Sequence, residues 1–238
     1  MPARTNLSDE RSLFGLASEE MATREAHRIE RAMAQARFPV LKELADFEWS
    51  AVPSVPKARI LELAQGASIP KAEPIILLGN PGLGKSHVAS GLGLAACRQG
   101  HRVRFYHAAG LVNDLIKAQQ EYQLSRVMAQ LCKLEVLVLD ELGFIPFTQT
   151  GAQLLFQVCS ALYERVAMIM TTNWRFAEWS TIMGGDERLS AALLDRLTHK
   201  ATILACVGTS YRFRQQLQHQ HQSGVEMAEP KEEETIEA

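Results

Sequence analysis

The sequence predicts an α/β protein built on a parallel five-stranded sheet with helices on both faces. Short, continuous apolar runs alternate along the chain with longer helical stretches, which is the order that βαβ units produce. The runs carry almost no polar residues, so they predict strands that are buried on both sides. We expect strands at residues 75–78, 103–106, 136–139, 166–171 and 202–207.

Helical stretches fill the intervals between these runs. We expect helices at residues 86–99, 108–133, 151–165 and 189–200, of which 108–133 is long enough for two. Ahead of the sheet, a weakly amphipathic helix is expected from Ser18 to Arg37, and a short one at residues 57–65 within a proline-marked connector. The first helix carries mixed charge and little apolar surface, so it either docks on a partner or forms a solvated arm.

Composition places the chain among ordinary globular proteins, with 47% hydrophobic and 22% charged residues. No apolar stretch reaches the roughly 18 residues of a spanning helix, and the N-terminus has no apolar signal region. We therefore expect a cytoplasmic protein without membrane contact. The four cysteines show no CxxC spacing and three lie in apolar runs, which predicts buried free thiols.

The net charge of −2 is unevenly distributed. Residues 226–238 hold six glutamates against one lysine, a net charge of −5, and are low in complexity. This composition predicts an acidic, disordered tail. The remainder of the chain is mildly basic at +3, which permits nucleic-acid binding without requiring it.

A phosphate-binding loop follows the first predicted strand and opens the next helix. Its eight residues fit GxxxxGK[ST] at every fixed position: Gly79, Asn80, Pro81, Gly82, Leu83, Gly84, Lys85 and Ser86. Glycines let main-chain N–H groups turn inward around phosphates, and the helix that follows directs its positive end at the same place. We expect Lys85 to contact the β- and γ-phosphates of ATP and the Ser86 hydroxyl to coordinate Mg²⁺.

Two adjacent carboxylates, Asp140 and Glu141, end the third predicted strand. At that edge of the sheet Asp140 can bind Mg²⁺ through water, and Glu141 can orient and deprotonate an attacking water. The two need different roles, because like charges this close share a site best when one faces a metal. A helix cap after the strand is the alternative interpretation.

Two further polar residues are candidates for the same site. Asn173 follows the fourth strand, whose tip lies between those of the first and third strands if the sheet order is 5-1-4-3-2. It could hold the attacking water or touch the γ-phosphate, or it could simply end the strand in a turn. Arg196 precedes the fifth strand and could neutralise transition-state charge at a neighbouring subunit's nucleotide. A solvated helix arginine, or one paired with Asp195, is the alternative.

A series of segments carries a family resemblance. Besides the phosphate loop, these segments are Phe38-Pro39, Phe47-Glu48-Trp49, residues 139–144, residues 148–156, Thr171-Thr172-Asn173, residues 193–197 and residues 208–212. Over about residues 10–215 the chain resembles the IstB group of AAA+ ATPases, which assist the transposase IstA of bacterial insertion sequences. It is also similar to the related helicase loader DnaC.

The resemblance implies roles for individual residues. Lys85, Ser86, Asp140 and Glu141 would form the two nucleotide motifs, with Asn173 as first sensor and Arg196 as arginine finger. Arg212 resembles a second nucleotide sensor, and the 26 residues after it are polar or acidic, so no full C-terminal lid is expected. The group carries a helical insertion after the second strand that lines a DNA channel. The phosphate contacts expected there are Lys117, Arg126 and Lys133, and a solvated face is the alternative for each.

These expectations divide the chain into an N-terminal helical arm (1–50), an AAA+ ATPase domain (51–215) and an acidic tail (216–238). The resemblance implies a homo-oligomer with ATP between subunits, which surrounds duplex DNA and recruits and stimulates an IstA-like transposase. The alternative is a DnaC-like helicase loader, although residues 1–48 hold no metal-binding cysteines and little apolar surface. A small-molecule kinase, the third possibility, needs an acceptor pocket and a lid that the sequence does not show.

Overall fold

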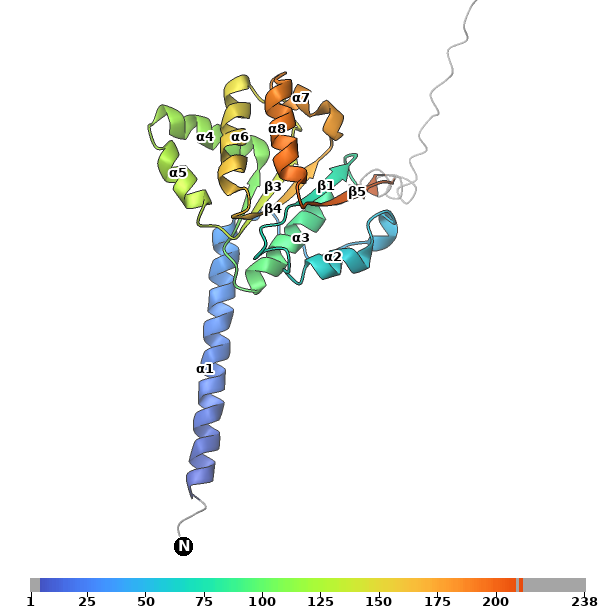
Figure 1. Ribbon diagram of the computed structural model, residues 1–238. Helices are drawn as coiled ribbons and strands as arrows, with labels where there is room; N and C mark the ends of the chain where they lie inside the picture. The colour runs from blue at the N-terminus through green and yellow to red at the C-terminus, as the bar shows by residue number, and fades with distance from the viewer. Residues whose placement is uncertain (1–4, 209, 212–238) are drawn as a thin grey trace, which may run out of the picture.

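The computed structural model describes residues 5–208, 210 and 211, and it confirms the predicted sheet (Figure 1). Five parallel strands lie in the order β2-β3-β4-β1-β5, which is the expected order read from the other edge. The strands are β1 (Ile75–Gly79), β2 (Val103–His107), β3 (Val136–Leu142), β4 (Ala167–Thr172) and β5 (Thr202–Cys206). Because the strands are parallel, all their carboxyl ends meet at one edge, where ligands bind in such sheets.

Helices cover both faces of this sheet (Figure 1). One face carries α4 (Ala108–Gln120), α5 (Leu124–Leu131), α6 (Gln149–Leu162), α7 (Trp179–Ile182) and α8 (Glu187–Thr198). The other face carries α2 (Lys57–Leu63), α3 (Lys85–Arg98) and the end of α1 (Thr5–Ala36). The stretch 108–133 is thus two helices, as its length predicted.

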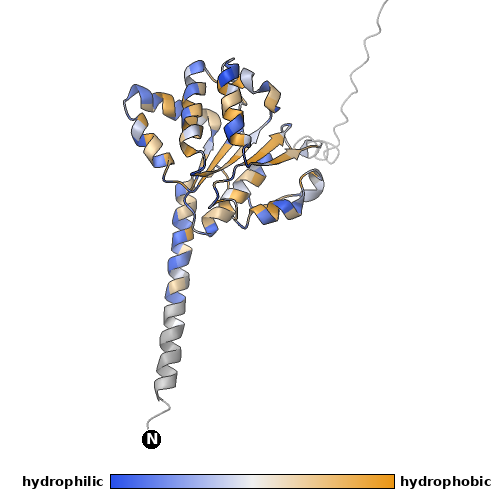
Figure 2. Cartoon of the chain, viewed as in Figure 1, coloured by the Kyte–Doolittle hydropathy of each residue, from blue (hydrophilic) through white to orange (hydrophobic). Residues whose placement is uncertain are grey.

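Two apolar cores lie on opposite sides of the strands. Ile76 packs into the core under α4 and α6, whereas Ile75 and Leu77 pack into the core under α3. This alternation follows from the two-residue period of a strand. Figure 2 shows the strands as the most uniformly hydrophobic part of the molecule, as expected for a sheet covered on both faces.

Helix α1 begins earlier than predicted and runs away from the body of the molecule (Figure 1). The expected start at Ser18 was wrong, because the helix continues back to Thr5 through residues that include no proline. The leucine, arginine, glutamate and alanine residues of this segment favour a helix. Among the α1 side chains that the structure describes, those that join a core lie at the C-terminal end, with Ala36 buried and Ala32 and Met33 partly buried.

Before β1 the chain forms two short 3₁₀ turns, Leu44–Asp46 and Trp49–Ala51, and a third, Phe176–Glu178, precedes α7. Helices α6 and α8 each begin two residues before the expected position. The Thr148 hydroxyl accepts a hydrogen bond from the main-chain N of Gly151, and the Asp186 carboxylate accepts one from Leu189. These side chains cap the orphan N–H groups of the first turn and so extend the helices backwards.

The cysteines are free thiols, and three of the four are buried, as expected. Burial raises the pKa of Cys159 to about 12 and those of Cys97 and Cys206 to about 11. Cys132, at the end of α5, is exposed. Among the described residues, no helix combines the length and the apolar character needed to cross a bilayer.

Candidate nucleotide-binding site

The glycine-rich loop connects β1 to α3 at the carboxyl edge of the sheet. Gly79, Gly82 and Gly84 all have positive φ angles, of 147°, 81° and 74°. A Cβ on Gly79 would lie 2.1 Å from the main-chain O of Cys206, and one on Gly84 would lie 2.5 Å from the Phe47 ring. The loop therefore needs glycine both for its backbone angles and for its close neighbours.

Lys85 is buried inside the curve of this loop. Its Nζ donates hydrogen bonds to the main-chain oxygens of Gly79, at 2.7 Å, and Asn80, at 2.8 Å. Lys85 is also the first residue of α3, whose N-terminal N–H groups and dipole attract anions. The ammonium group and the helix terminus thus provide positive charge at one point.

Asp140 is a buried carboxylate, only 2% exposed, that two hydroxyl groups hold. Ser86 Oγ donates to its Oδ1 from α3 at 2.8 Å, and Thr171 Oγ1 donates to the same oxygen from β4 at 2.5 Å. Asp140, Ser86 and Thr171 bring oxygen atoms together here, and oxygens are the ligands that Mg²⁺ prefers. The residues present therefore fit a magnesium ion beside the phosphate loop.

Glu141 has an unusual backbone. Its φ angle is +58°, in the left-handed region, and β3 shifts register between Leu139 and Leu142. The strand was expected to end at residue 139, but it continues through this irregularity to pair Leu142 with Thr172. The main-chain N of Glu141 donates to Thr171 Oγ1 at 2.9 Å, while its side chain is 50% exposed. A strained acidic residue held in this way is typical of functional sites.

His107 is a member of this site that sequence reasoning missed. It ends β2 directly beside Asp140 in the sheet register. Its Nδ1 lies 3.8 Å from Asp140 Oδ2 and 3.6 Å from Glu141 Oε2. The sequence did show that His107 directly follows a predicted strand. That position lies beside the acidic pair because β2 and β3 are neighbours in the sheet.

A pocket of about 450 Å³ lies over the phosphate loop, and Asp140 and His107 are outside its lining. Asn173, which is half-buried, lines it together with the loop, Glu141 and Thr171. The segment before β1 supplies a further wall that sequence reasoning did not assign. Phe47 packs edge-on against Trp49 and His87, with ring centroids 4.7 and 5.2 Å apart, and it lies over Gly84.

Arg196 lies on α8, outside the lining of this pocket. Within the described part of the chain its partners are on α6, where its Nη1 donates to Ser160 Oγ at 3.2 Å and its guanidinium stacks 4.7 Å from the Phe156 ring centroid. These contacts do not include the ion pair with Asp195 that was the alternative interpretation of Arg196. In a single subunit, therefore, Arg196 does not reach the phosphate loop.

The remaining predicted residues lie elsewhere. Lys117 and Arg126 are exposed on α4 and α5, and Lys117 Nζ lies 3.9 Å from Glu121. Lys133 follows α5 and lines a different groove. Arg212 and the acidic tail fall outside the described residues.

The position of the loop defines the class of protein. A glycine-rich loop between the first strand and its helix, with the fourth strand inserted between the first and third, is the arrangement of AAA+ P-loop proteins. The chain belongs to the family of IstB-like ATP binding proteins, whose pattern matches residues 2–219. This confirms the resemblance seen in the sequence.

Individual relatives agree with this assignment. An ATP-binding protein ascribed to insertion sequence IS21 of Pseudomonas aeruginosa is 38% identical over 213 residues, covering 90% of this chain and 80% of its own length. Its counterpart from IS5376 of Geobacillus stearothermophilus is 37% identical over 210 residues, covering 88% and 83%.

Solved structures of lower identity share the fold. The crystal structure of the DnaC helicase loader has a TM-score of 0.54 at 19% identity, covering 63% of this chain and 88% of that one. The crystal structure of DnaI has a TM-score of 0.59 at 15% identity, covering 70% and 91%.

Proposed function

We propose that this chain is an ATPase that binds ATP and Mg²⁺ at the 450 Å³ pocket and hydrolyses the bond between the β- and γ-phosphates. The observation that carries the proposal is the buried Lys85 ammonium at the start of α3, next to the hydroxyl-held Asp140. A cation, a helix terminus and an oxygen donor set meet there, which matches a triphosphate with its metal. The walls from Phe47 and Val52 would take the nucleotide base.

Each polar residue then has a separate task. Lys85 and the main-chain N–H groups of the loop hold the phosphates, while Ser86 and Asp140 hold Mg²⁺, which supplies charge neutralisation when bound. Glu141 accepts the proton of the attacking water, and Asn173 orients that water or the γ-phosphate. Arg212 is proposed as a second sensor of the nucleotide.

The position of Arg196 supports a homo-oligomer. Because this guanidinium rests on α6 and does not line the pocket of its own subunit, it would act on the nucleotide of the next subunit. Nucleotide state would then control assembly, with the arm at residues 1–50 helping the subunits or the DNA to dock onto the ATPase domain at residues 51–215.

We infer that the oligomer is a cytoplasmic transposition helper that encloses duplex DNA and recruits and stimulates an IstA-like transposase. The relatives named for insertion sequences support this inference. The fold of the DnaC helicase loader supports the second candidate, a loader of replicative helicase. Affinity capture with purified transposase and purified replicative helicase separates the two, because each candidate predicts retention of one partner and not the other.

The variant Glu141→Gln tests the catalytic proposal. It keeps the shape of the side chain but cannot take a proton, so ATP hydrolysis should fall at least about a hundredfold while ATP affinity is retained. Phosphate release and nucleotide titration measure the two effects, and the ATP-bound assembly should persist on DNA.

Glu121→Gln is the matched control, since Glu121 is exposed at the turn after α4 and should leave hydrolysis unchanged. Normal hydrolysis by Glu141→Gln would remove Glu141 from the mechanism.

A further inference from the structure

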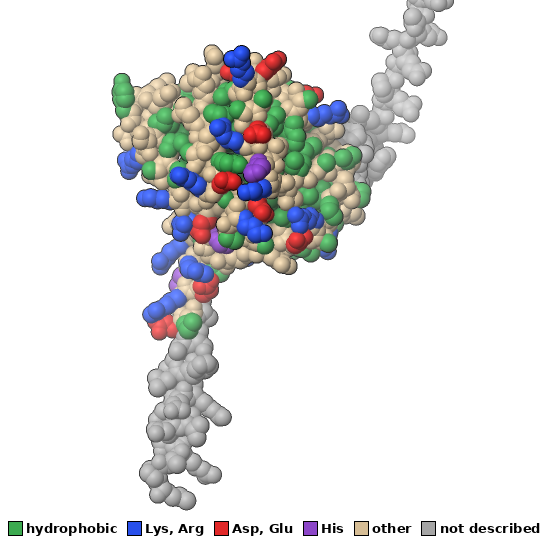
Figure 3. Space-filling model, viewed as in Figure 1, with side chains coloured by type: hydrophobic (Ala, Val, Ile, Leu, Met, Phe, Trp, Pro, Cys, Tyr) green, Lys and Arg blue, Asp and Glu red, His purple; other side chains and the backbone are tan. Residues whose placement is uncertain are grey.

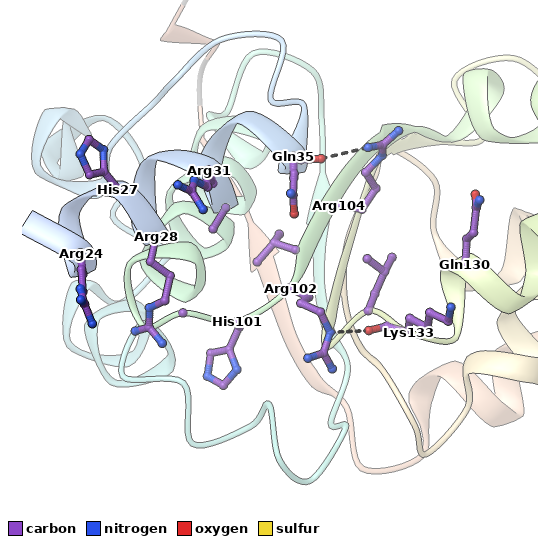
Figure 4. Close-up of a pocket in the computed structure, with 14 residues that line it drawn as sticks. Arg24, His27, Arg28, Arg31, Gln35, His101, Arg102, Arg104, Gln130 and Lys133 are labelled. Atoms are coloured by element: carbon purple, nitrogen blue, oxygen red, sulfur yellow. Dashed lines mark hydrogen bonds between the residues drawn. The ribbon is translucent and has the colours of Figure 1, made fainter.

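A second, larger hollow lies where α1 meets the rest of the molecule (Figure 4). This α1–β2 groove has a volume of about 890 Å³, and fourteen residues line it. None of them is acidic, whereas six are arginine or lysine: Arg24, Arg28, Arg31, Arg102, Arg104 and Lys133. The groove is at the amino end of β2, so it lies at the opposite edge of the sheet from the phosphate loop.

One wall of the groove is a single stripe of α1. Arg24, Arg28 and Arg31, with His27 and Gln35, recur at the spacing that places side chains on one helix face. Figure 4 shows these side chains along one side of the groove, and Figure 3 shows charged side chains gathered where α1 joins the body. From Arg24 to Arg31 the helix rises about 10 Å, which is about the rise of three base pairs along the axis of duplex DNA.

The opposite wall comes from the turn before β2 and from the end of α5. Arg102 Nε donates to the main-chain O of Lys133 at 2.7 Å, and Arg104 Nη1 donates to the main-chain O of Gln35 at 2.9 Å (Figure 4). Gly100 has a φ of +85°, and a Cβ there would lie 2.7 Å from Arg28 Nη2. Main-chain contacts therefore fix where the guanidinium groups of Arg102 and Arg104 lie.

Positive charge remains in excess after local pairing. Glu20, Glu25 and Glu135 pair with Arg24, Arg28 and Arg102 respectively. Burial acts to raise the pKa of Glu135, but hydrogen bonds from Arg102 and His101 lower it overall, so this carboxylate stays ionised. Among the residues that the structure describes, the side chains of Arg31 and Lys133 have no carboxylate partner.

We propose that the α1–β2 groove holds the phosphate backbone of duplex DNA, with Arg31 and Lys133 contacting phosphates from opposite walls. The proposal rests on the DNA-binding function inferred above and moves its main contact surface away from the α4–α5 insertion. Guanidinium groups match phosphate oxygens in pairs, and five of the six cations here are arginines.

An extended, evenly charged ligand fits this groove better than a small anion does. The cations are distributed along two turns of α1 and across to α5 instead of converging on one point. Such a distribution favours a polyanion with repeated charges and gives contacts that depend on the backbone, not on base sequence.

The double variant Arg31→Glu/Lys133→Glu tests the groove. Fluorescence anisotropy with a labelled duplex, over a range of salt concentrations, should show affinity at least about tenfold weaker. The slope of log affinity against log salt should become shallower by about two, one for each phosphate that the variant no longer neutralises. ATP binding should stay unchanged, because the two sites lie at opposite edges of the sheet.

Two matched variants complete the experiment. Lys117→Glu/Arg126→Glu reverses the same number of charges on α4 and α5 and should bind DNA nearly as the unchanged protein does. Arg31→Lys/Lys133→Arg keeps the charges and should retain affinity. If Arg31→Glu/Lys133→Glu bound DNA normally and the α4–α5 variant bound it weakly, the α1–β2 groove would not be the DNA contact surface. The DNA-binding function itself would still stand. A folded, ATP-binding wild-type protein that takes up no duplex DNA would overturn both this inference and the DNA-binding function.

Discussion

At the scale of single residues, Thr171 connects the parts of the acidic pair. Its hydroxyl donates to Asp140 Oδ1 and accepts from the main-chain N of Glu141. One side chain on β4 thus holds the buried carboxylate and supports the left-handed backbone of the next residue. A conformation of this kind costs about 1–3 kcal/mol and persists only when its neighbours enforce it.

Replacing Thr171 with valine should therefore weaken both stability and catalysis. The shape is kept, but Asp140 loses a donor and the Glu141 N–H loses its acceptor inside the protein, which should cost about 1–3 kcal/mol of unfolding free energy. ATP hydrolysis should fall by more than ATP affinity, because the position of Glu141 changes. Urea unfolding, phosphate release and nucleotide titration measure the three quantities.

Thr23→Val on the exposed part of α1 provides the comparison, since the Thr23 hydroxyl bonds only within its own helix. It should change unfolding free energy by no more than about 0.5 kcal/mol. Equal effects at both positions would show that the hydroxyl of Thr171 has no special role.

Sequence reasoning proposed Lys85, Ser86, Asp140 and Glu141 because their chemistry follows from linear spacing. Thr171 and His107 could not be assigned in the same way, since their contacts to the acidic pair cross between strands. The predicted strand order places β2 beside β3. The register that brings His107 beside Asp140 depends on packing along both strands, which the sequence pattern does not give.

At the scale of elements, the β1–α3 connection shows why the loop begins with glycine. Gly79 ends β1 with a positive φ, against the main-chain O of Cys206 on β5. Backbone oxygens in a sheet cannot move aside as a flexible side chain can. The junction of these two strands therefore tolerates no Cβ without displacement.

Two glycine-to-alanine changes with opposite expected signs test this interpretation. Gly79→Ala should destabilise the fold by about 1–3 kcal/mol or more, through strain and displacement of β5. Gly110→Ala should stabilise it by up to about 0.5–1 kcal/mol, since Gly110 lies in α4 with no atom within 4 Å of an added Cβ. Thermal unfolding of both variants gives the signs. If Gly79→Ala were neutral, the close approach to Cys206 would not matter for stability.

The element boundaries show where sequence patterns stop being informative. The strands were predicted to within a few residues because buried apolar runs mark them clearly. The predicted start of α1 was wrong. Helices α6 and α8 begin two residues earlier than predicted, because the side chains of Thr148 and Asp186 cap them, and the predicted ranges took no account of these caps.

At the scale of the whole molecule, β2 and β3 separate two differently charged places. Their carboxyl ends carry His107 and the acidic pair beside the phosphate loop. Their amino ends lie near Arg102, which lines the α1–β2 groove. The sequence predicted the first place from motifs. It could not predict the second, because the docking of α1 against β2 depends on long-range packing and on contacts such as that of Arg104 with the main-chain O of Gln35.

The central claim is that the loop from Gly79 to Ser86 binds ATP. Calorimetric titration of the full chain with ATP in the presence of Mg²⁺ tests it most directly. We expect saturable binding at one site per chain, reduced at least about tenfold by Lys85→Ala, since that change removes the buried cation facing the phosphates. Lys71→Ala, at an exposed lysine beside Glu73, should bind ATP normally. Folded protein that takes up no ATP, or a Lys85→Ala variant with unchanged affinity, would contradict the claim.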